Sequence, residues 1–151
     1  MESDLNWFIA VRNKVSEYLH DTRQFDFNQA LNWYRMSDTK YWVVVTDGEN
    51  LGYFRIKEGQ SPEFSYIGMD LDIPYQGKKL APKIYRKFVE DILVPKGVEQ
   101  LLLRVKKSNK RAFSLYEGLG FSIVEITELD FLMSVPISVL MDKTVQFSST
   151  N

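Results

Sequence analysis

Two segments of this sequence combine glycine, lysine and polar residues in a way that suits a phosphate-bearing ligand. The first, residues 76–81, reads Gln-Gly-Lys-Lys-Leu-Ala and lies between an apolar stretch and a long amphipathic one. Unpaired amides and the positive end of the dipole make the turn before a helix a natural seat for phosphate oxygens. Lys78 and Lys79 would oppose that dipole unless an anion is present. We therefore interpret the segment as a phosphate-binding turn, with a solvated loop as the alternative.

The second segment, residues 108–121, reads Ser-Asn-Lys-Arg-Ala-Phe-Ser-Leu-Tyr-Glu-Gly-Leu-Gly-Phe. Its apolar spacing predicts a short helix over residues 110–119, and Gly120 is typical of a C-terminal cap. The bland interpretation is a helix whose apolar residues merely pack. Against that interpretation, the cap, the tyrosine, the Gly-Phe pair and the upstream segment would all have to coincide by chance.

Together the two segments resemble the coenzyme A motifs of the GNAT family of N-acetyltransferases. The family's first motif has Arg or Gln, two residues, Gly, one residue, then Gly or Ala. Gln76 and Ala81 match it, whereas Lys79 stands at the usual middle glycine. The second motif is matched in register by Asn109, Ala112, Leu115, Tyr116, Gly120 and Phe121. The resemblance covers residues 41–121 well and the final strands loosely, and it is weak before residue 40.

The resemblance implies that acetyl-CoA is the co-substrate and that no metal takes part. In the family, the strand before the first motif parts from its neighbour and binds the pantetheine arm through its backbone, as an added strand would. By position that role falls to Met69, Leu71 and Ile73. The implied coenzyme-binding residues are Met69, Leu71, Ile73, Gln76, Gly77, Lys78, Lys79, Leu80, Ala81, Asn109, Arg111 and Tyr116.

Within that set, the pyrophosphate is expected on the amides of residues 77–81, with Asn109 beside the pantetheine arm. A glycine at position 79 would allow close backbone approach, so the lysine there puts the loop in question. A lysine already inside a helical turn would be tolerated there, with its side chain pointing outward.

Acetyl transfer to an amine needs an oxyanion donor, a proton for the departing thiolate and a base. The resemblance makes Tyr116 the acid, and an unperturbed tyrosine has a pKa of about 10. The backbone amide of Leu71 is the expected oxyanion donor. The base is left open between Glu63 and Asp70, with a water-mediated proton transfer, Asp72 or His20 as alternatives. Asp70 and Asp72 are expected to share one face of their strand.

The acceptor amine is expected to depend on residues 1–40. Arg12-Asn13, His20-Asp21, Phe25, Trp33 and Tyr41-Trp42 are loosely similar to GNAT members that acetylate nucleotide-linked amino sugars in surface-glycan synthesis. These aromatic residues could equally form a core. Other acceptors remain open: a protein N-terminus, a lysine side chain, a polyamine or an antibiotic.

Two other classes of function are alternatives. A non-catalytic coenzyme-A-binding regulatory module would fit the Lys79 departure and the unidentified base. A nucleic-acid-binding domain would rest on the basic residues of segment 104–111, which are Arg104, Lys106, Lys107, Lys110 and Arg111. That basic segment is better placed to meet the 3′-phosphate of the coenzyme.

The elements that must position these residues follow from periodicity and turn signals. Helices are predicted at residues 3–19 and 26–34, the second capped by Asp26, and again from an i, i+4 stripe at Leu80, Ile84, Phe88 and Ile92. Strands are predicted at 41–46, 51–56, 64–71, 100–105, 121–129 and 137–141, with Asp47-Gly48 as a hairpin turn. This order predicts an α+β, or mixed α/β, GNAT-like fold: a mostly antiparallel sheet flanked by helices, with splayed strands that hold the coenzyme.

The composition fits a single globular domain. The chain has 151 residues, 44% hydrophobic and 26% charged, with a formal net charge of −1. It has no cysteine and one histidine, which excludes disulfides and disfavours a zinc site. We expect one domain over 1–151: a helical acceptor-side region (1–40), an acetyl-CoA-binding core (41–121), final strands (122–147) and a loose tail (148–151).

The expected setting is cytoplasmic, because neither a signal peptide nor a membrane-spanning run is evident. The expected partner is a small-molecule amine, with a nucleotide-linked sugar as the leading candidate. No nucleic acid or membrane partner is expected, and a homodimer is left open.

Overall fold

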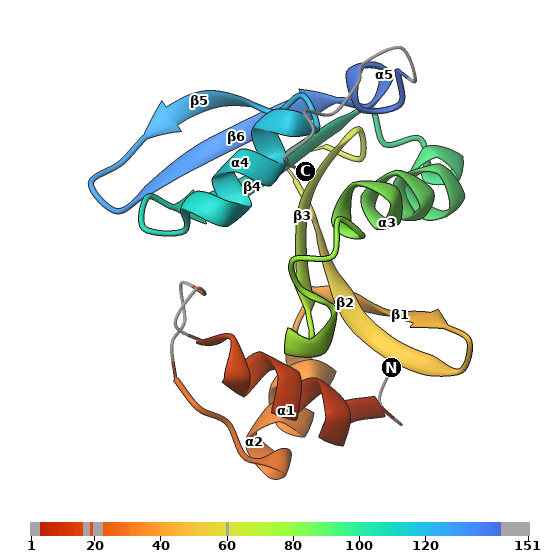
Figure 1. Cartoon of the computed structure of the whole chain (residues 1–151), viewed down its shortest axis with the longest axis vertical. Helices are drawn as coiled ribbons and strands as arrows, with labels where there is room; N and C mark the ends of the chain where they lie inside the picture. The colour runs from red at the N-terminus through yellow and green to blue at the C-terminus, as the bar shows by residue number, and fades with distance from the viewer. Residues whose placement is uncertain (1–3, 17–18, 20–22, 60, 143–151) are drawn as a thin grey trace. The chain divides into compact units, whose positions relative to one another are not determined.

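The computed structural model describes residues 4–16, 19, 23–59 and 61–142 (Figure 1). It divides into two compact units, one formed by residues 1–57 and 67–76 and the other by 58–66 and 77–151. Six strands are hydrogen-bonded in the order β1-β2-β3-β4-β6-β5. Strand β3 (Phe64–Leu71) contributes its first residues to the second unit and its last residues to the first. The predicted α+β class, a largely antiparallel sheet with helices, is confirmed.

The first unit opens with two helices, α1 (Leu5–Lys14) and α2 (Phe27–Met36), which lie side by side (Figure 1). Asp26 caps α2 as predicted: its side chain accepts from the amide of Gln29, and the Gln29 side chain accepts in return. The apolar core of this unit comprises Leu5, Phe8, Ile9, Val11, Ala30, Tyr41 and Tyr53. The helix predicted at residues 3–19 is shorter in the structure, since α1 ends at Lys14.

A hairpin of β1 (Lys40–Thr46) and β2 (Glu49–Glu58) follows, and the two strands pair antiparallel. The turn residues Asp47 and Gly48 both have positive φ, 52° and 78°. This is the backbone of the tight hairpin turns that match strand twist, so the predicted hairpin is confirmed.

The second unit continues with α3 (Ala81–Phe88), a π-helical turn η4 (Val89–Leu93) and a 3₁₀ turn η5 (Val94–Lys96). The predicted stripe through Ile92 therefore spans two kinds of helix. Pro95 has no amide hydrogen, and its ring would clash with the carbonyl of Asp91 in a regular α-helix. Strand β4 (Gln100–Lys106) and helix α4 (Lys110–Gly118) match the prediction closely.

The C-terminal part differs from the prediction. The strand expected over 121–129 is the shorter β5 (Ser122–Ile126), and a strand that was not predicted, β6 (Asp130–Pro136), pairs antiparallel with both β4 and β5. The strand expected over 137–141 is wrong, because Ile137–Leu140 forms helix α5. Pro136 directly precedes α5, and a proline cannot donate to a sheet ladder. A five-residue run with four apolar residues does not distinguish strand from helix by periodicity.

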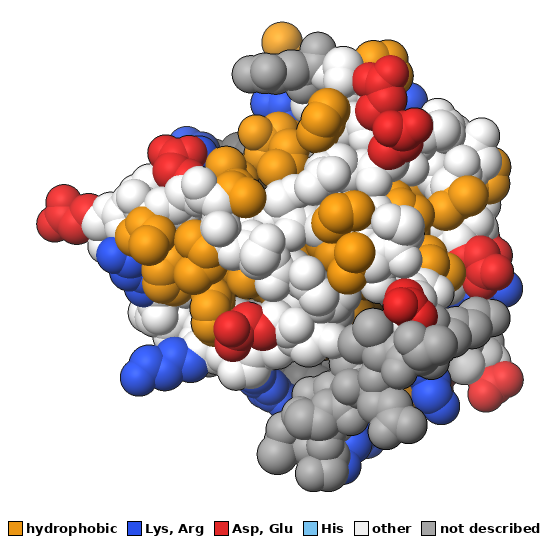
Figure 2. Space-filling model, turned by 90° about the horizontal axis from the view of Figure 1, so that it is seen from above, with side chains coloured by type: hydrophobic (Ala, Val, Ile, Leu, Met, Phe, Trp, Pro, Cys, Tyr) orange, Lys and Arg blue, Asp and Glu red, His pale blue; other side chains and the backbone are white. Residues whose placement is uncertain are grey.

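Strand β5 ends the strand order and is exposed along its length. Ile123, Val124 and Ile126 are 40%, 57% and 62% exposed. Hydrophobic side chains also gather toward the left of the surface seen from above in Figure 2. Within the described residues, no helix is long and apolar enough to cross a membrane.

Candidate active site

The turn before α3 has left-handed backbone at two positions. Gly77 has a φ of 72° and Lys79 a φ of 60°, and both are exposed. Helix α3 begins only at Ala81, with Leu80 as its N-cap. Lys79 therefore lies outside the helix, so the substitution is not accommodated by a helical turn at this position. Glycine adopts this φ without steric cost, whereas a lysine does so against its Cβ, which accounts for the glycine usual in the motif.

In the same turn, the backbone amides of successive residues point toward a common anion-binding position. Lys79 is left-handed, and Leu80, with φ −84° and ψ −32°, is right-handed. Consecutive residues of opposite hand form a concave nest of N–H groups that suits an anion. The N-terminus of α3 adds its own unpaired amides to this nest. The geometry therefore fits a phosphate group at residues 77–81.

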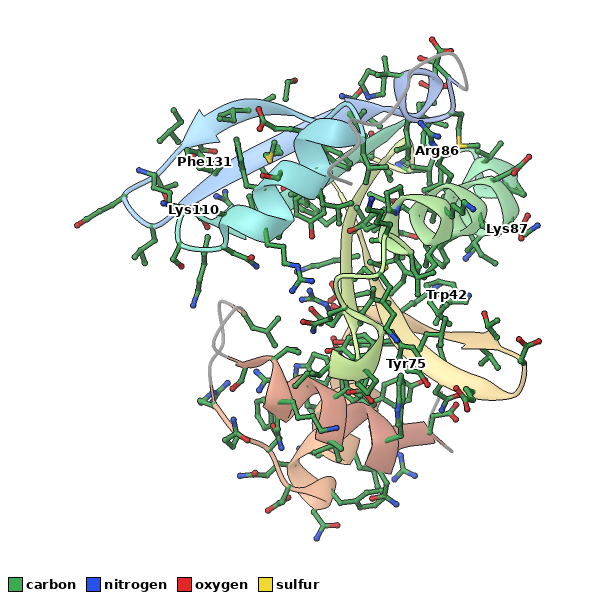
Figure 3. The ribbon with its side chains drawn as sticks, in the orientation of Figure 1. Trp42, Tyr75, Arg86, Lys87, Lys110 and Phe131 are labelled. Carbon is green, nitrogen blue, oxygen red and sulfur yellow. The ribbon has the colours of Figure 1, made fainter. Side chains whose placement is uncertain are left out.

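Helix α4 brings an arginine to this turn. A Cβ added to Gly77 would lie 2.6 Å from Nη2 of Arg111, so the guanidinium rests where a side chain would otherwise be. Arg111 is the second residue of α4. It follows Lys110, which Figure 3 labels at the start of that helix. Asn109 is the N-cap: its side-chain oxygen accepts from the amide of Ala112 at 3.2 Å. The two predicted motifs therefore meet at Gly77 and Arg111.

Tyr116 lies on α4 with its ring held by two aromatic neighbours. It is 9% exposed, and its ring centroid is 6.0 Å from that of Tyr85 and 5.7 Å from that of Phe121. Tyr85, on α3, is fully buried. The predicted acid is thus part of the packing between α3 and α4. Tyr85 was not predicted as a site residue, because it lies one place outside the apolar stripe of α3.

Helix α3 is also tied to the end of the chain's described part. Arg86 donates from Nε to the carbonyl of Leu140 in α5 at 3.1 Å (Figure 3). This bond holds in place the helix whose N-terminus adds amides to the proposed phosphate-binding turn at residues 77–81.

In the first unit, the end of β3 offers an open backbone edge. The amide of Asp72 donates to the carbonyl of Leu51 in β2 at 2.8 Å. Successive strand residues turn their backbone groups to opposite sides, so those of Leu71 and Met69 point away from β2. The carbonyl of Leu71 accepts from Nε2 of Gln76 at 2.9 Å, which agrees with this direction.

Strand β3 pairs in parallel with β4 only over Phe64–Tyr66, which lie opposite Gln100–Leu102. Within the described residues, the pairing with β4 does not extend to Met69 or Leu71, and the side chain of Gln76 occupies the Leu71 carbonyl. Ile73 differs from the expectation, since it lies in the 3₁₀ turn η3 (Ile73–Tyr75). Its amide donates to the Asp72 carboxylate at 2.8 Å, and its carbonyl accepts from the Gln76 amide at 3.2 Å.

The candidate bases have different surroundings. Asp70 pairs with Arg55 across β2 and β3 at 3.4 Å. Asp72 lies past the strand end, caps η3 and pairs with Lys14 at 3.4 Å, so the two acids have different partners. Glu63 is exposed in the turn before β3, and a hydrogen bond from Ser61 lowers its pKa. His20 lies outside the described residues.

The residues that suggested a nucleotide-linked sugar serve mainly in packing. Arg12 is 8% exposed, with its guanidinium 4.4 Å from the ring centroid of Phe25. Asn13 bonds the backbone of Phe25 through both its amide nitrogen and its oxygen, at 3.0 and 3.1 Å. Tyr41 is buried, and burial raises the pKa of its hydroxyl well above the ordinary value. Trp33 keeps 41% exposure and meets Tyr41 edge to face.

The basic segment 104–111 is partly neutralised. Arg104 pairs with Asp130 at 3.3 Å and with Glu125 at 3.7 Å. The ammonium of Lys107 lies 5.6 Å from the ring centroid of Phe131 on β6. The two ion pairs of Arg104 reduce the net charge that this segment offers to a nucleic acid.

The model of the Acetyltransferase (GNAT) family matches residues 8–121, which is most of the chain. The chain therefore belongs to this family. It is an acetyl-CoA-dependent N-acetyltransferase by class, as the motifs predicted. The match begins well before residue 40, where the sequence resemblance was weak. No curated protein sequence matches the chain significantly.

Solved structures share the fold at low sequence identity. Spermidine N-acetyltransferase from Vibrio cholerae, in complex with CoA and spermine, superposes with a TM-score of 0.80 at 16% identity, covering 94% of this chain and 95% of that one. Aminoglycoside acetyltransferase AAC(6')-Ib, with coenzyme A and kanamycin, gives 0.78 at 18% identity, covering 95% of each chain. The yncA protein of Salmonella typhimurium, with acetyl-CoA, gives 0.71 at 17% identity, covering 91% and 90%.

Among the described residues, no group of three His, Asp or Glu side chains could hold a metal ion.

Proposed function

We propose that this chain transfers the acetyl group of acetyl-CoA to a primary amine of a small molecule, and that the turn at 77–81 holds the pyrophosphate of the coenzyme. The observation that carries this is the arrangement of Gly77, Lys79 and Arg111. Left-handed Lys79 and right-handed Leu80 form an amide nest before a helix, and the guanidinium of Arg111 lies against Gly77 in the same turn. Backbone amides and an arginine are the donors that phosphate oxygens prefer.

In the proposed reaction the amine nitrogen attacks the thioester carbonyl carbon, a C–N bond forms, and the C–S bond breaks. The amide of Leu71 donates to the oxyanion, and the hydroxyl of Tyr116 gives its proton to the departing thiolate. Backbone groups of Met69 and Leu71 pair with the pantetheine arm, and Asn109 lies beside it.

We propose that water takes the proton released by the amine. Of the two predicted bases, Asp70 is engaged by Arg55, and a base role would have to compete with that ion pair. Glu63 lies eight residues before Leu71 in an exposed turn, and its lowered pKa makes it a weaker base. Glu63 therefore lacks the raised pKa that suits a general base near neutral pH.

The acceptor we propose is a polyamine-like cationic amine. Two proteins of the same fold are described with spermine and with kanamycin, which are both polycationic amines. The nucleotide-linked amino sugar is the second candidate. Exposed Trp33 favours it, because an aromatic face can stack on a base.

Thiol release from acetyl-CoA, measured with spermidine, kanamycin and a nucleoside-diphosphate-linked amino sugar, tests these acceptors. Turnover only on the sugar would overturn the polyamine assignment. Coenzyme binding without turnover on any amine would favour the non-catalytic module.

Replacing the acid gives a sharper test. Tyr116→Phe should lower kcat about a hundredfold or more while the Kd for acetyl-CoA stays unchanged. Tyr66→Phe removes the same hydroxyl from an exposed strand residue and should leave kcat as it was. Unchanged turnover in Tyr116→Phe removes that residue as the acid. A homodimer stays a prediction, which light scattering can check.

A further inference from the structure

An ion pair between a partly exposed arginine and a largely buried carboxylate joins β2 to β3 directly beside the proposed oxyanion donor. Nε of Arg55 lies 3.4 Å from Oδ2 of Asp70. The Asp70 side chain is 11% exposed and its Oδ2 is inaccessible to solvent. Tyr53 is fully buried on the same face of β2, and burial, followed by the charge of Asp70, raises the pKa of its hydroxyl.

The backbone of β3 is shaped to receive the arginine. A Cβ added to Gly68 would lie 2.6 Å from Nη2 and 2.8 Å from Cζ of Arg55. Gly68 and Asp70 are two residues apart and so share one face of the strand. The guanidinium therefore lies across β3 from Gly68 to Asp70, in a space that only glycine leaves open.

The two strands also approach closely at this point. A Cβ on Gly52 of β2 would collide with the carbonyl of Asp70. Close backbone approach and an ion pair together hold residue 70 against β2. Since Leu71 is the next residue, the rotation of the strand at Asp70 sets the direction in which the Leu71 amide points.

We propose that Arg55 is a positioning residue, which acts through Asp70 to hold the Leu71 amide in the direction that stabilises the oxyanion. This inference rests on the proposed function, because it takes Leu71 as the donor. It also gives Asp70 a role other than the base predicted for it. An oxyanion donor must be fixed before the reaction to be effective, and a misplaced one loses most of its value.

The test uses the carbonyl stretching band of bound acetyl-CoA labelled with carbon-13 at the thioester carbonyl, read by infrared difference spectroscopy. A donor at the carbonyl lowers the band frequency. We expect the parent enzyme to show this shift, and Arg55→Gln to lose most of it. Its kcat should fall about tenfold to a hundredfold, with the Kd for acetyl-CoA within about threefold of the parent. Arg55→Lys, which keeps the charge, should recover part of both.

A second ion pair offers a matched control. Arg104 and Asp130 lie 3.3 Å apart, with side chains 40% and 8% exposed, against 37% and 11% for Arg55 and Asp70. Asp130→Asn should lower the melting temperature and keep the frequency shift of the carbonyl band. If Arg55→Gln does not fold, Gly68→Ala displaces the guanidinium without removing it and should give the same loss of shift.

The outcomes separate the two proposals. A shifted band in the parent that persists in Arg55→Gln and Gly68→Ala overturns the positioning role and leaves the acetyltransferase function intact. An unshifted band in the parent overturns both the Leu71 donor and its positioning. If Asp130→Asn loses the frequency shift to the same extent as Arg55→Gln, the loss reflects a general effect of stability, and the role of Arg55 is also overturned.

Discussion

Replacing Lys79 by glycine should stabilise the free protein and weaken coenzyme binding, two effects of opposite sign from one position. Lys79 has a φ of 60°, where an L-residue pays about 1–2 kcal/mol relative to right-handed backbone. Glycine removes that cost, but it adds about 0.5–1 kcal/mol of conformational entropy to the unfolded chain. The net gain should be about 0.5–1 kcal/mol, or about 1–4 °C in Tm for a domain of this length.

The effect on the coenzyme comes from the lost charge. Lys79 is exposed, and exposed ion pairs contribute about 0.2–1 kcal/mol. Lys79→Gly should therefore raise the Kd for acetyl-CoA about 1.5- to 5-fold at low salt, with a smaller difference at high salt. Thermal unfolding without ligand and titration calorimetry at two salt concentrations measure the two effects separately.

Lys79→Ala is the matched control, because it removes the same charge but keeps a Cβ at the left-handed position. It should bind the coenzyme as weakly as Lys79→Gly without the gain in Tm. If Lys79→Gly melts no higher than Lys79→Ala, the backbone strain argument is wrong. If either variant binds acetyl-CoA as tightly as the parent at low salt, the lysine does not contact the phosphates.

Two further predictions concern the phosphate turn and alkaline pH. Gly77→Glu should abolish the rise in Tm that acetyl-CoA causes, because it brings a carboxylate to the anion seat and displaces Arg111; Gly97→Glu, at a similar φ of 79° with open space around it, should lose stability but keep that rise. Equal rises in Tm for Gly77→Glu and the parent would mean that the phosphate site is elsewhere. Burial raises the pKa of Tyr41 and Tyr53 in the folded state, so above about pH 10 only the unfolded chain releases these protons and stability should fall as pH rises. Absorbance at alkaline pH checks this, and ionisation of every tyrosine before unfolding would contradict it.

Local chemistry allowed much of the fold to be predicted. Asp26, Asp47-Gly48 and Gly120 are residues whose own backbone or side-chain preferences define a cap or a turn, and each ends or begins an element where it was expected to. The boundaries of Phe64–Leu71 were predicted for the same reason, since Pro62 and Pro74 flank an apolar, β-rich run. These signals act over a few residues and need no tertiary partner.

The errors fall where the deciding contact is distant. Strand β6 pairs with β4 some thirty residues earlier, and nothing within the run from Asp130 indicates that pairing. The helix at Ile137–Leu140 begins with the amide of Ile137 donating to the carbonyl of Glu99. The role proposed for Arg55 was not predicted from the sequence. The available signal was that Arg55 lies two residues from buried Tyr53 and so shares the inward face of an apolar strand.

The motifs alone determined the chemistry of this protein, because the types and spacing of residues from Gln76 to Ala81 and from Asn109 to Phe121 suffice to indicate coenzyme binding. Only the tertiary structure decided how that chemistry is positioned. It put Arg111 against Gly77, gave Lys79 a left-handed backbone and joined Arg55 to Asp70 across two strands. Such contacts join residues that are separated along the chain. Their geometry is set by the packing of whole elements, which no local pattern of residues encodes.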